Sequence, residues 1–167
     1  MQTKFLRNEF WYGGAVYESY KQPIGEEDSV EWDFRENPTA NQIMPLFLST
    51  KGRYIWSEKG FQIQFHKGMI QAEGDCEILL KEGYDSLRGA YLEAMKQHFP
   101  FHEIRLSKRF FEAPVYNTWI EMTFYQEQNR ILEYARGILE HGLPTGILMI
   151  DDGWSPYYGK WQFRKDN

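Results

Sequence analysis

The stretch from Pro45 to Leu80, PLFLSTKGRYIWSEKGFQIQFHKGMIQAEGDCEILL, decides the fold of the first half of this chain. Short apolar runs alternate in it with Lys-Gly pairs. Glycine in short connections between apolar runs is typical of hairpins, so the pattern predicts a β-meander. Within it, Phe61, Ile63 and Phe65 alternate with polar residues. This alternation predicts strands with one face on a core and the other in water.

The segments before the meander extend the same architecture. EFWYGGAVY, residues 9–17, predicts a strand, a turn and a second strand, and residues 24–42 form an acidic, turn-rich loop or strand connection. We therefore predict an N-terminal β-sandwich over residues 1–83.

The apolar period changes after the sandwich. Apolar residues then recur at spacings of three and four, which predicts a helix that stops before Pro100. The apolar residues of this helix are Leu87, Ala90, Tyr91, Ala94 and Met95. Residues 84–113 are accordingly assigned to a connecting helix and linker.

The last third of the chain has the order strand, helix, strand. NTWIEMTF, residues 117–124, is rich in β-formers, and residues 125–142 carry an apolar stripe that ends at Gly142. GILMI, residues 146–150, is the continuous apolar run of a parallel strand. One helix cannot cover both faces of two parallel strands, so residues 114–167 are expected to open a larger parallel α/β domain, and the chain is expected to be a fragment.

Composition limits the partners. The formal net charge is −5 and no basic tract is present, so no nucleic acid partner is expected. No apolar run is long enough for a membrane span, and the N-terminal residues lack a secretion signal, so no membrane partner is expected and a cytoplasmic location is compatible. Cys76 is the single cysteine, and Pro100 interrupts the spacing between His98 and His102, so no metal site is predicted.

Two carboxylates follow the last predicted strand. Asp151 and Asp152 stand where active-site residues gather in parallel α/β folds, at the carboxyl end of a strand. Their loop also carries Trp154 and Trp161, and flat rings beside carboxylates are suited to gripping a sugar. The alternative is that one aspartate caps a turn while the other is solvated. Trp119, on the first predicted strand, would face the same site or fill the core.

These residues resemble a known family. Residues 114–167, with IDDGW followed by YGKW, look like the start of the catalytic barrel of glycoside hydrolase family 31, which comprises α-glucosidases, α-xylosidases and α-galactosidases. FWYGG and MPLFLSTKGRYIWSE resemble segments of the β-sandwich that precedes that barrel. DDGW also occurs in family 36 α-galactosidases, so the tetrapeptide alone does not separate the two families.

The resemblance implies a β-sandwich followed by the first βαβ part of an incomplete (β/α)8 TIM barrel. The parent protein would be a retaining α-glycosidase acting on an α-linked sugar without a cofactor. The substrate-binding residues carried over are Asp151, Asp152, Trp154, Trp119 and Trp161. The family's nucleophile and acid/base lie on the fourth and sixth barrel strands, so no catalytic residue is assigned and the chain alone is expected to be inactive.

Two other interpretations stay open at this point. The chain could be a non-catalytic carbohydrate-binding or interaction module whose aromatic residues serve a sandwich surface. It could also be a structural fragment that associates with itself through exposed barrel edges.

Overall fold

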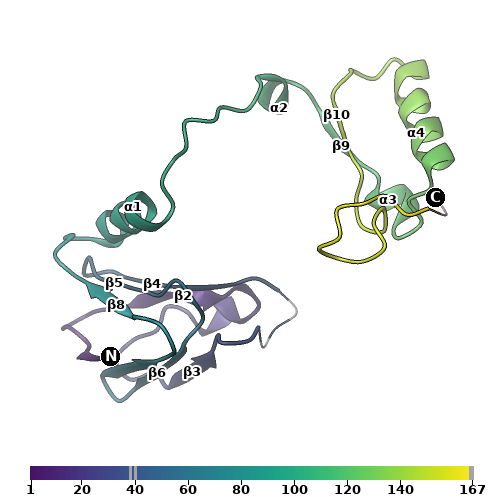
Figure 1. The fold of residues 1–167 in the computed structure, drawn as a ribbon. Coiled ribbons are helices and arrows are strands. Elements are labelled where there is room, and N and C mark those ends of the chain that lie inside the picture. The colour runs from purple at the N-terminus through teal and green to yellow at the C-terminus, as the bar shows by residue number, and fades with distance from the viewer. Residues whose placement is uncertain (38, 40, 166–167) are drawn as a thin grey trace. The chain divides into compact units, whose positions relative to one another are not determined.

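The computed structural model describes residues 1–37, 39 and 41–165 (Figure 1). The chain divides into two compact units, the first spanning Met1–His102 and the second beginning at Glu103.

The first unit contains two four-stranded antiparallel sheets. One has the strand order β1-β7-β6-β3, with β1 (Gln2–Lys4), β3 (Val30–Asp33), β6 (Gln62–His66) and β7 (Met69–Glu73). The other has the order β2-β4-β5-β8, with β2 (Trp11–Ala15), β4 (Ile43–Ser49), β5 (Tyr54–Trp56) and β8 (Leu79–Lys81). The strands predicted over residues 45–80 are confirmed as β4 to β8, but the predicted single meander is wrong, because the hairpins β4-β5 and β6-β7 belong to different sheets and β8 returns to pair with β5.

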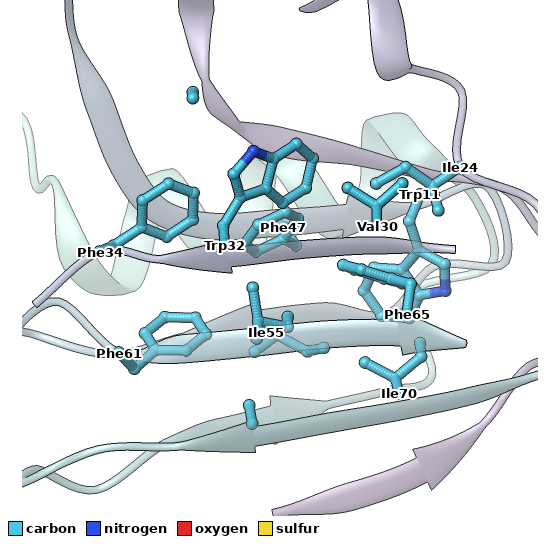
Figure 2. Packing of buried hydrophobic residues seen from close by; sticks show 13 residues of the cluster. Trp11, Ile24, Val30, Trp32, Phe34, Phe47, Ile55, Phe61, Phe65 and Ile70 are labelled. Atoms are coloured by element: carbon cyan, nitrogen blue, oxygen red, sulfur yellow. The ribbon is translucent and has the colours of Figure 1, made fainter. Parts of the chain in front are cut away.

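Aromatic rings from both sheets form the core between them (Figure 2). Phe47 of β4 lies 5.7 Å from Trp32 of β3 and 5.5 Å from Phe65 of β6, measured between ring centroids. Phe61, Ile63 and Phe65 are fully buried, so the predicted alternation along this segment is confirmed. This is the two-layer arrangement expected of a β-sandwich.

The glycine pair in EFWYGGAVY lies within one strand, opposite a bulge in β4. The register of β2 on β4 shifts between Gly13 and Gly14, and the 3₁₀ helix η1 (Val16–Lys21) follows the strand. Gly13 has a φ of +143°, and a Cβ there would lie 2.2 Å from the carbonyl oxygen of Leu46. The predicted turn between two strands is therefore wrong, because the glycines lie within β2, where the bulged β4 approaches closely.

The predicted helix is confirmed as α1 (Leu87–His98), which packs against β4 and β5. Ala90 and Ala94 are fully buried, and their small side chains let the helix approach the sheet closely. At its end, the ring of His98 stacks on Trp56 with 4.6 Å between centroids. The helix therefore belongs to the same compact unit as the sheets.

Ser86 caps the N-terminus of α1, because its hydroxyl oxygen accepts a hydrogen bond from the backbone N–H of Gly89 at 3.1 Å. We expect Ser86→Ala to lower the free energy of unfolding by about 1 kcal/mol, since it leaves that N–H without its cap. Ser86→Asp retains an acceptor and is the matched control. Urea denaturation of the three proteins measures the effect, and equal losses in both variants would contradict the role assigned to the cap.

A buried ion pair links the segments that precede β2 and β5, and Arg53 also bonds to β1 of the other sheet. The side chains of Arg53 and Glu9 are 3% and 0% exposed, and Arg53 Nε donates to Glu9 Oε1 at 2.8 Å. Arg53 also donates to Glu82 at 2.9 Å and to the carbonyl oxygen of Lys4 at 2.9 Å, while Ser49 donates to Glu9. Burial acts to raise the pKa of Glu9. The hydrogen bonds that Glu9 accepts from Arg53 and Ser49 outweigh this effect and hold its pKa below the usual value. Glu9 is therefore ionised in the native protein.

The second unit has the predicted order of strand, helix and strand. Its elements are α2 (Arg109–Glu112), β9 (Val115–Asn117), α3 (Trp119–Met122), α4 (Gln128–Glu140) and β10 (Ile147–Met149). β9 and β10 pair in parallel, and α4 lies in the connection between them (Figure 1). The described residues thus contain one βαβ unit, and the larger (β/α)8 barrel stays a prediction.

The first strand of this unit ends earlier than the sequence suggests. The predicted strand over residues 117–124 is wrong, because β9 stops at Asn117 and Trp119–Met122 form the short helix α3. The side-chain oxygen of Asn117 accepts the backbone N–H of Trp119 at 2.6 Å, which turns the chain out of the strand. Local side-chain bonding therefore overrides the β propensity of WIEMTF.

The βαβ unit leaves much apolar surface open. No side chain of α4 is buried by the part of the chain that the structure describes, and Leu132 and Leu139 of its apolar stripe are exposed. Met122 is the one buried apolar side chain among the described residues of this unit. Among the described helices, none has the length and apolar character needed to cross a membrane.

Candidate functional site

The site begins where the two parallel strands end together. Asn117 pairs with Met149, so the residues that follow β9 and β10 emerge at the same sheet edge. The backbone N–H of Thr118 donates to the carbonyl oxygen of Met149 at 3.1 Å, and that of Asp151 donates to the Thr118 hydroxyl at 3.0 Å. These bonds place Asp151 directly beside the end of β9.

Both carboxylate oxygens of Asp151 accept hydrogen bonds within the protein. Oδ1 accepts the backbone N–H of Asp152 at 2.8 Å, and Oδ2 accepts the side-chain N–H of Asn117 at 2.6 Å. Both bonds hold the pKa of Asp151 below its usual value, and the bond from the Asp152 N–H has a larger effect than the bond from Asn117. Asp151 is therefore an ionised and fixed group that positions the loop.

Asp152 is more open than its neighbour. Its Oδ2 accepts the hydroxyl of Tyr158 at 2.8 Å, whereas no hydrogen bond reaches Oδ1 from the residues that the structure describes. The bond to Asp152, together with its negative charge, raises the pKa of Tyr158. Asp152 thus offers a free acceptor oxygen in a loop rich in aromatic rings.

A sharp turn brings the aromatic residues to the aspartates. Gly153 has a φ of +94°, and a Cβ there would lie 2.4 Å from the carbonyl oxygen of Phe124. Beyond it, the ring of Trp154 lies 5.9 Å from Trp161 and 5.6 Å from Phe163. Trp161 is 86% exposed, so much of its ring surface is open to a ligand.

The loop surrounds a small depression of about 210 Å³. Asp152 is the one carboxylate among the described residues that line it, and the other lining residues are Gly153, Trp154, Ser155, Tyr158, Gly159, Lys160 and Trp161. Trp154 also lines a larger apolar groove of about 380 Å³, next to Ile131 and Leu132 of α4. The depression therefore combines an acceptor, hydroxyl groups, a cation and flat rings.

Trp119 lies apart from the depression, on α3. Its ring packs edge-on against Phe124 with 4.9 Å between centroids, and it is absent from the described lining residues. The structure thus gathers Asp152, Trp154 and Trp161 around one depression with Asp151 adjacent in the loop. Trp119 follows β9 at the same sheet edge, and its part in sugar binding stays a prediction.

Sequence reasoning missed the residues that hold the site in place. The Thr118 hydroxyl donates to the side-chain oxygen of Gln126 at 2.6 Å, and the Gln126 amide donates to the carbonyl oxygen of Thr123 at 2.6 Å. Thr118 and Gln126 are both buried. The Asn-Thr pair at residues 117 and 118 is the signal that could have revealed this network, because both side chains readily bond to nearby backbone.

The Asp152 carboxylate is expected to control the titration of Tyr158. Asp152→Asn removes the charge that opposes formation of the phenolate, so we expect the pKa of Tyr158 to fall towards its ordinary value of 10.0. An NMR titration of the tyrosine ring carbons measures this change, with Glu133→Gln on α4 as a matched loss of charge. An unchanged Tyr158 titration in Asp152→Asn would contradict the hydrogen bond.

The arrangement is chemically suited to binding hydroxyl groups. The carboxylate of Asp152 accepts hydrogen bonds, Ser155 and Tyr158 carry hydroxyls that donate and accept, and the indole rings offer flat apolar surface. Within residues 1–37, 39 and 41–165, no group of three or more His, Cys, Asp or Glu side chains could hold a metal ion.

Comparison with known proteins finds similarity to a glycosidase. The matching protein is the myogenesis-regulating glycosidase of Mus musculus, to which 53 residues of this chain are 34% identical. The match covers 32% of this chain and 7% of that protein. No protein-family model matches the chain.

Proposed function

We propose that this chain is part of a glycoside hydrolase and that the loop of residues 151–161 binds the hydroxyl groups of an α-linked sugar. The observation that carries the proposal is the free Oδ1 of Asp152 in a depression walled by Trp154 and the exposed Trp161. A sugar presents hydroxyls at its edge and C–H groups on its face, so it needs an acceptor beside a flat ring. The similarity to a glycosidase supports the same function.

The proposal extends to a retaining α-glycosidase of the family 31 type, with α-glucosides, α-xylosides or α-galactosides as substrates. The βαβ unit would be the first part of a (β/α)8 barrel, whose active sites lie at the carboxyl ends of the strands. Asp151 and Asp152 stand at that end of β10. Trp119 would add a surface next to the sugar from the end of β9.

Asp151 and Asp152 are assigned to binding and positioning. A retaining glycosidase needs two carboxyl groups about 5 to 5.5 Å apart, on opposite sides of the scissile bond. Asp151 has both oxygens engaged by Asn117 and by the Asp152 backbone, and Asp152 is the one carboxylate among the described residues that line the depression. We therefore propose that the nucleophile and the acid/base are supplied by residues outside this chain.

A kinetic assay tests this assignment. The purified 167-residue chain is expected to release no more nitrophenol from 4-nitrophenyl α-glucoside, α-xyloside or α-galactoside than does the Asp151→Asn, Asp152→Asn double variant. Turnover by the unaltered chain above that of the double variant would show that the chain holds its own catalytic groups, and would contradict the proposal that the nucleophile and the acid/base are supplied by residues outside it.

A carbohydrate-binding module that uses aromatic rings on the sandwich receives less support. The rings that the sheets contribute are mainly in the core, where Trp11, Trp32, Phe47 and Phe65 are buried. Such rings are not available for stacking on a ligand. The loop after β10 is therefore the better candidate for aromatic sugar contacts.

A further inference from the structure

We propose that the outer face of the β1-β7-β6-β3 sheet is a second binding surface, which takes neutral oligosaccharides through a row of glutamine amides. This inference goes beyond the proposed function, because it concerns the first unit and does not depend on the loop after β10. It rests on the register of the four strands and on the side chains that this register brings together.

Pairing between strands aligns polar side chains across the whole sheet. Gln2 of β1 pairs with Gln71 of β7, Gln71 pairs with Gln64 of β6, and Gln64 pairs with Glu31 of β3. Paired residues point to the same face, and the alternate residues Ile63, Phe65 and Ile70 are fully buried in the core. The four polar side chains therefore form one row on the outer face, at intervals of about 4.8 Å.

A second row lies beside the first. This row lies two residues further along the strands, where Gln62 of β6 pairs with Asp33 of β3 and with Glu73 of β7. The Gln62 amide also donates to Glu31 Oε1 of the first row at 2.7 Å. Together the rows enclose a surface depression of about 650 Å³, which Gln62, Gln64, Gln71, Gln2, Glu31 and Glu73 help to line. The depression is thus a shaped surface rather than a set of scattered polar groups.

Three of these amides have unused hydrogen-bonding capacity. The side chains of Gln2, Gln64 and Gln71 make no hydrogen bond to any residue that the structure describes. Each amide supplies two N–H donors and an acceptor oxygen. A sugar hydroxyl both donates and accepts, so an amide can bind two hydroxyls of one sugar. A row of amides at regular spacing suits an extended chain of sugars.

The charge of the depression excludes other classes of ligand. Among the described residues that line it, none has a basic side chain. The amino terminus of Met1 is a cation there, but it donates to the carbonyl oxygen of Ala72, and Glu31 and Glu73 leave the lining negative, which disfavours phosphate groups and nucleic acid. Glu31 and Glu73 would repel acidic sugars. The large apolar side chains that anchor protein partners are likewise absent from the described sheet positions 31, 62, 64 and 71. A neutral oligosaccharide is the ligand that fits this chemistry.

NMR on the full 167-residue chain tests the surface. The chain, labelled with ¹⁵N, is titrated with maltotetraose and, separately, with cellotetraose. At least one tetrasaccharide is expected to shift the side-chain amide signals of Gln64 and Gln71 in a saturable manner. The double variant Gln64→Ala, Gln71→Ala is expected to bind at least about tenfold more weakly, because two amides that contact hydroxyls are lost.

Three controls make the result decisive. Gln42→Ala removes an exposed glutamine outside the depression and is expected to leave the affinity unchanged. Asp152→Ala is expected to leave the Gln64 and Gln71 shifts unchanged, which separates this surface from the loop after β10. If the alanine variant unfolds, Gln64→Met and Gln71→Met keep the side-chain length without the amide. The proposal is overturned if neither tetrasaccharide shifts these signals across the millimolar range, or if variants that keep the native spectrum bind as tightly as the unaltered chain.

Discussion

Arg53→Met is expected to lower the free energy of unfolding by roughly 3 to 5 kcal/mol, the cost of removing one partner from a buried ion pair. Glu9 would remain in the core with its carboxylate 0% exposed and its bonds to the guanidinium lost. The exposed Glu82 and the carbonyl oxygen of Lys4 would also lose the donor that ties them to Arg53. Urea denaturation of the full chain, followed by the indole N–H NMR signals of Trp11 and Trp32 in the first unit, measures the loss.

The matched control is the exposed ion pair between Arg35 and Asp33, whose side chains are 47% and 45% exposed. Arg35→Met is expected to leave the free energy of unfolding almost unchanged, because water screens an exposed pair. The double variant Glu9→Leu, Arg53→Met removes both buried charges and is expected to recover most of the loss. Equal effects of Arg53→Met and Arg35→Met would show that the buried pair does not stabilise the fold in this way.

The Arg53→Met defect is also expected to depend on pH. The native pKa of Glu9 lies below its ordinary value of 4.5. The ion pair therefore contributes fully to stability above pH 4.5, and this contribution is lost as the pH falls through the native pKa of Glu9. Without Arg53, Glu9 can escape the cost of its buried charge by taking up a proton. The difference between the two proteins should therefore narrow as the pH falls below 4.5.

Asp152→Ala is expected to weaken sugar binding by the loop about tenfold to a hundredfold. A hydrogen bond to a carboxylate contributes about 1.5 to 3 kcal/mol, and Oδ1 of Asp152 is the open acceptor in the depression. The change also releases the hydroxyl of Tyr158, which would become free to rotate away. Isothermal titration of the full chain with methyl α-glucoside, α-xyloside and α-galactoside measures the affinity.

Glu133→Ala on α4 is the control for this substitution, because it removes an exposed carboxylate from the same unit outside the depression. It is expected to leave the affinity unchanged. If Asp152→Ala binds these sugars as tightly as the unaltered chain, Asp152 does not contact the ligand and the proposed role of the loop fails.

Regular patterns in the sequence were sufficient to predict much of the fold. The alternation at Phe61, Ile63 and Phe65, and the spacing of Ala90 and Ala94, each encode a buried face within a few residues. The bulge opposite Gly13 could not be predicted in the same way, because its cause is the approach of Leu46 from a distant strand. A glycine pair is equally compatible with a turn and with a bulge until the neighbouring strand is known.

The exposed residues of the site could be predicted from the sequence, but the buried residues that hold them in place could not. Asp151 and Asp152 stand out because they end an apolar run, whereas Gln126 has no local signal and gains its role by bonding to Thr118 across the unit. The position of Trp119 was missed for a related reason. The side chain of Asn117 bonds to the next turn of backbone and ends the strand before the β-forming residues can extend it.

We propose that the loop of residues 151–161 holds a sugar between Asp152 and the indole rings, and the indole N–H signals of Trp154 and Trp161 would report such a contact. In a titration of the ¹⁵N-labelled chain with the three methyl α-glycosides, we predict that at least one sugar shifts both signals in a saturable manner. The Asp151→Asn, Asp152→Asn double variant should lose these shifts while it keeps the backbone spectrum of the first unit. Indole signals that no sugar moves, or that move equally in the double variant, would contradict this proposal.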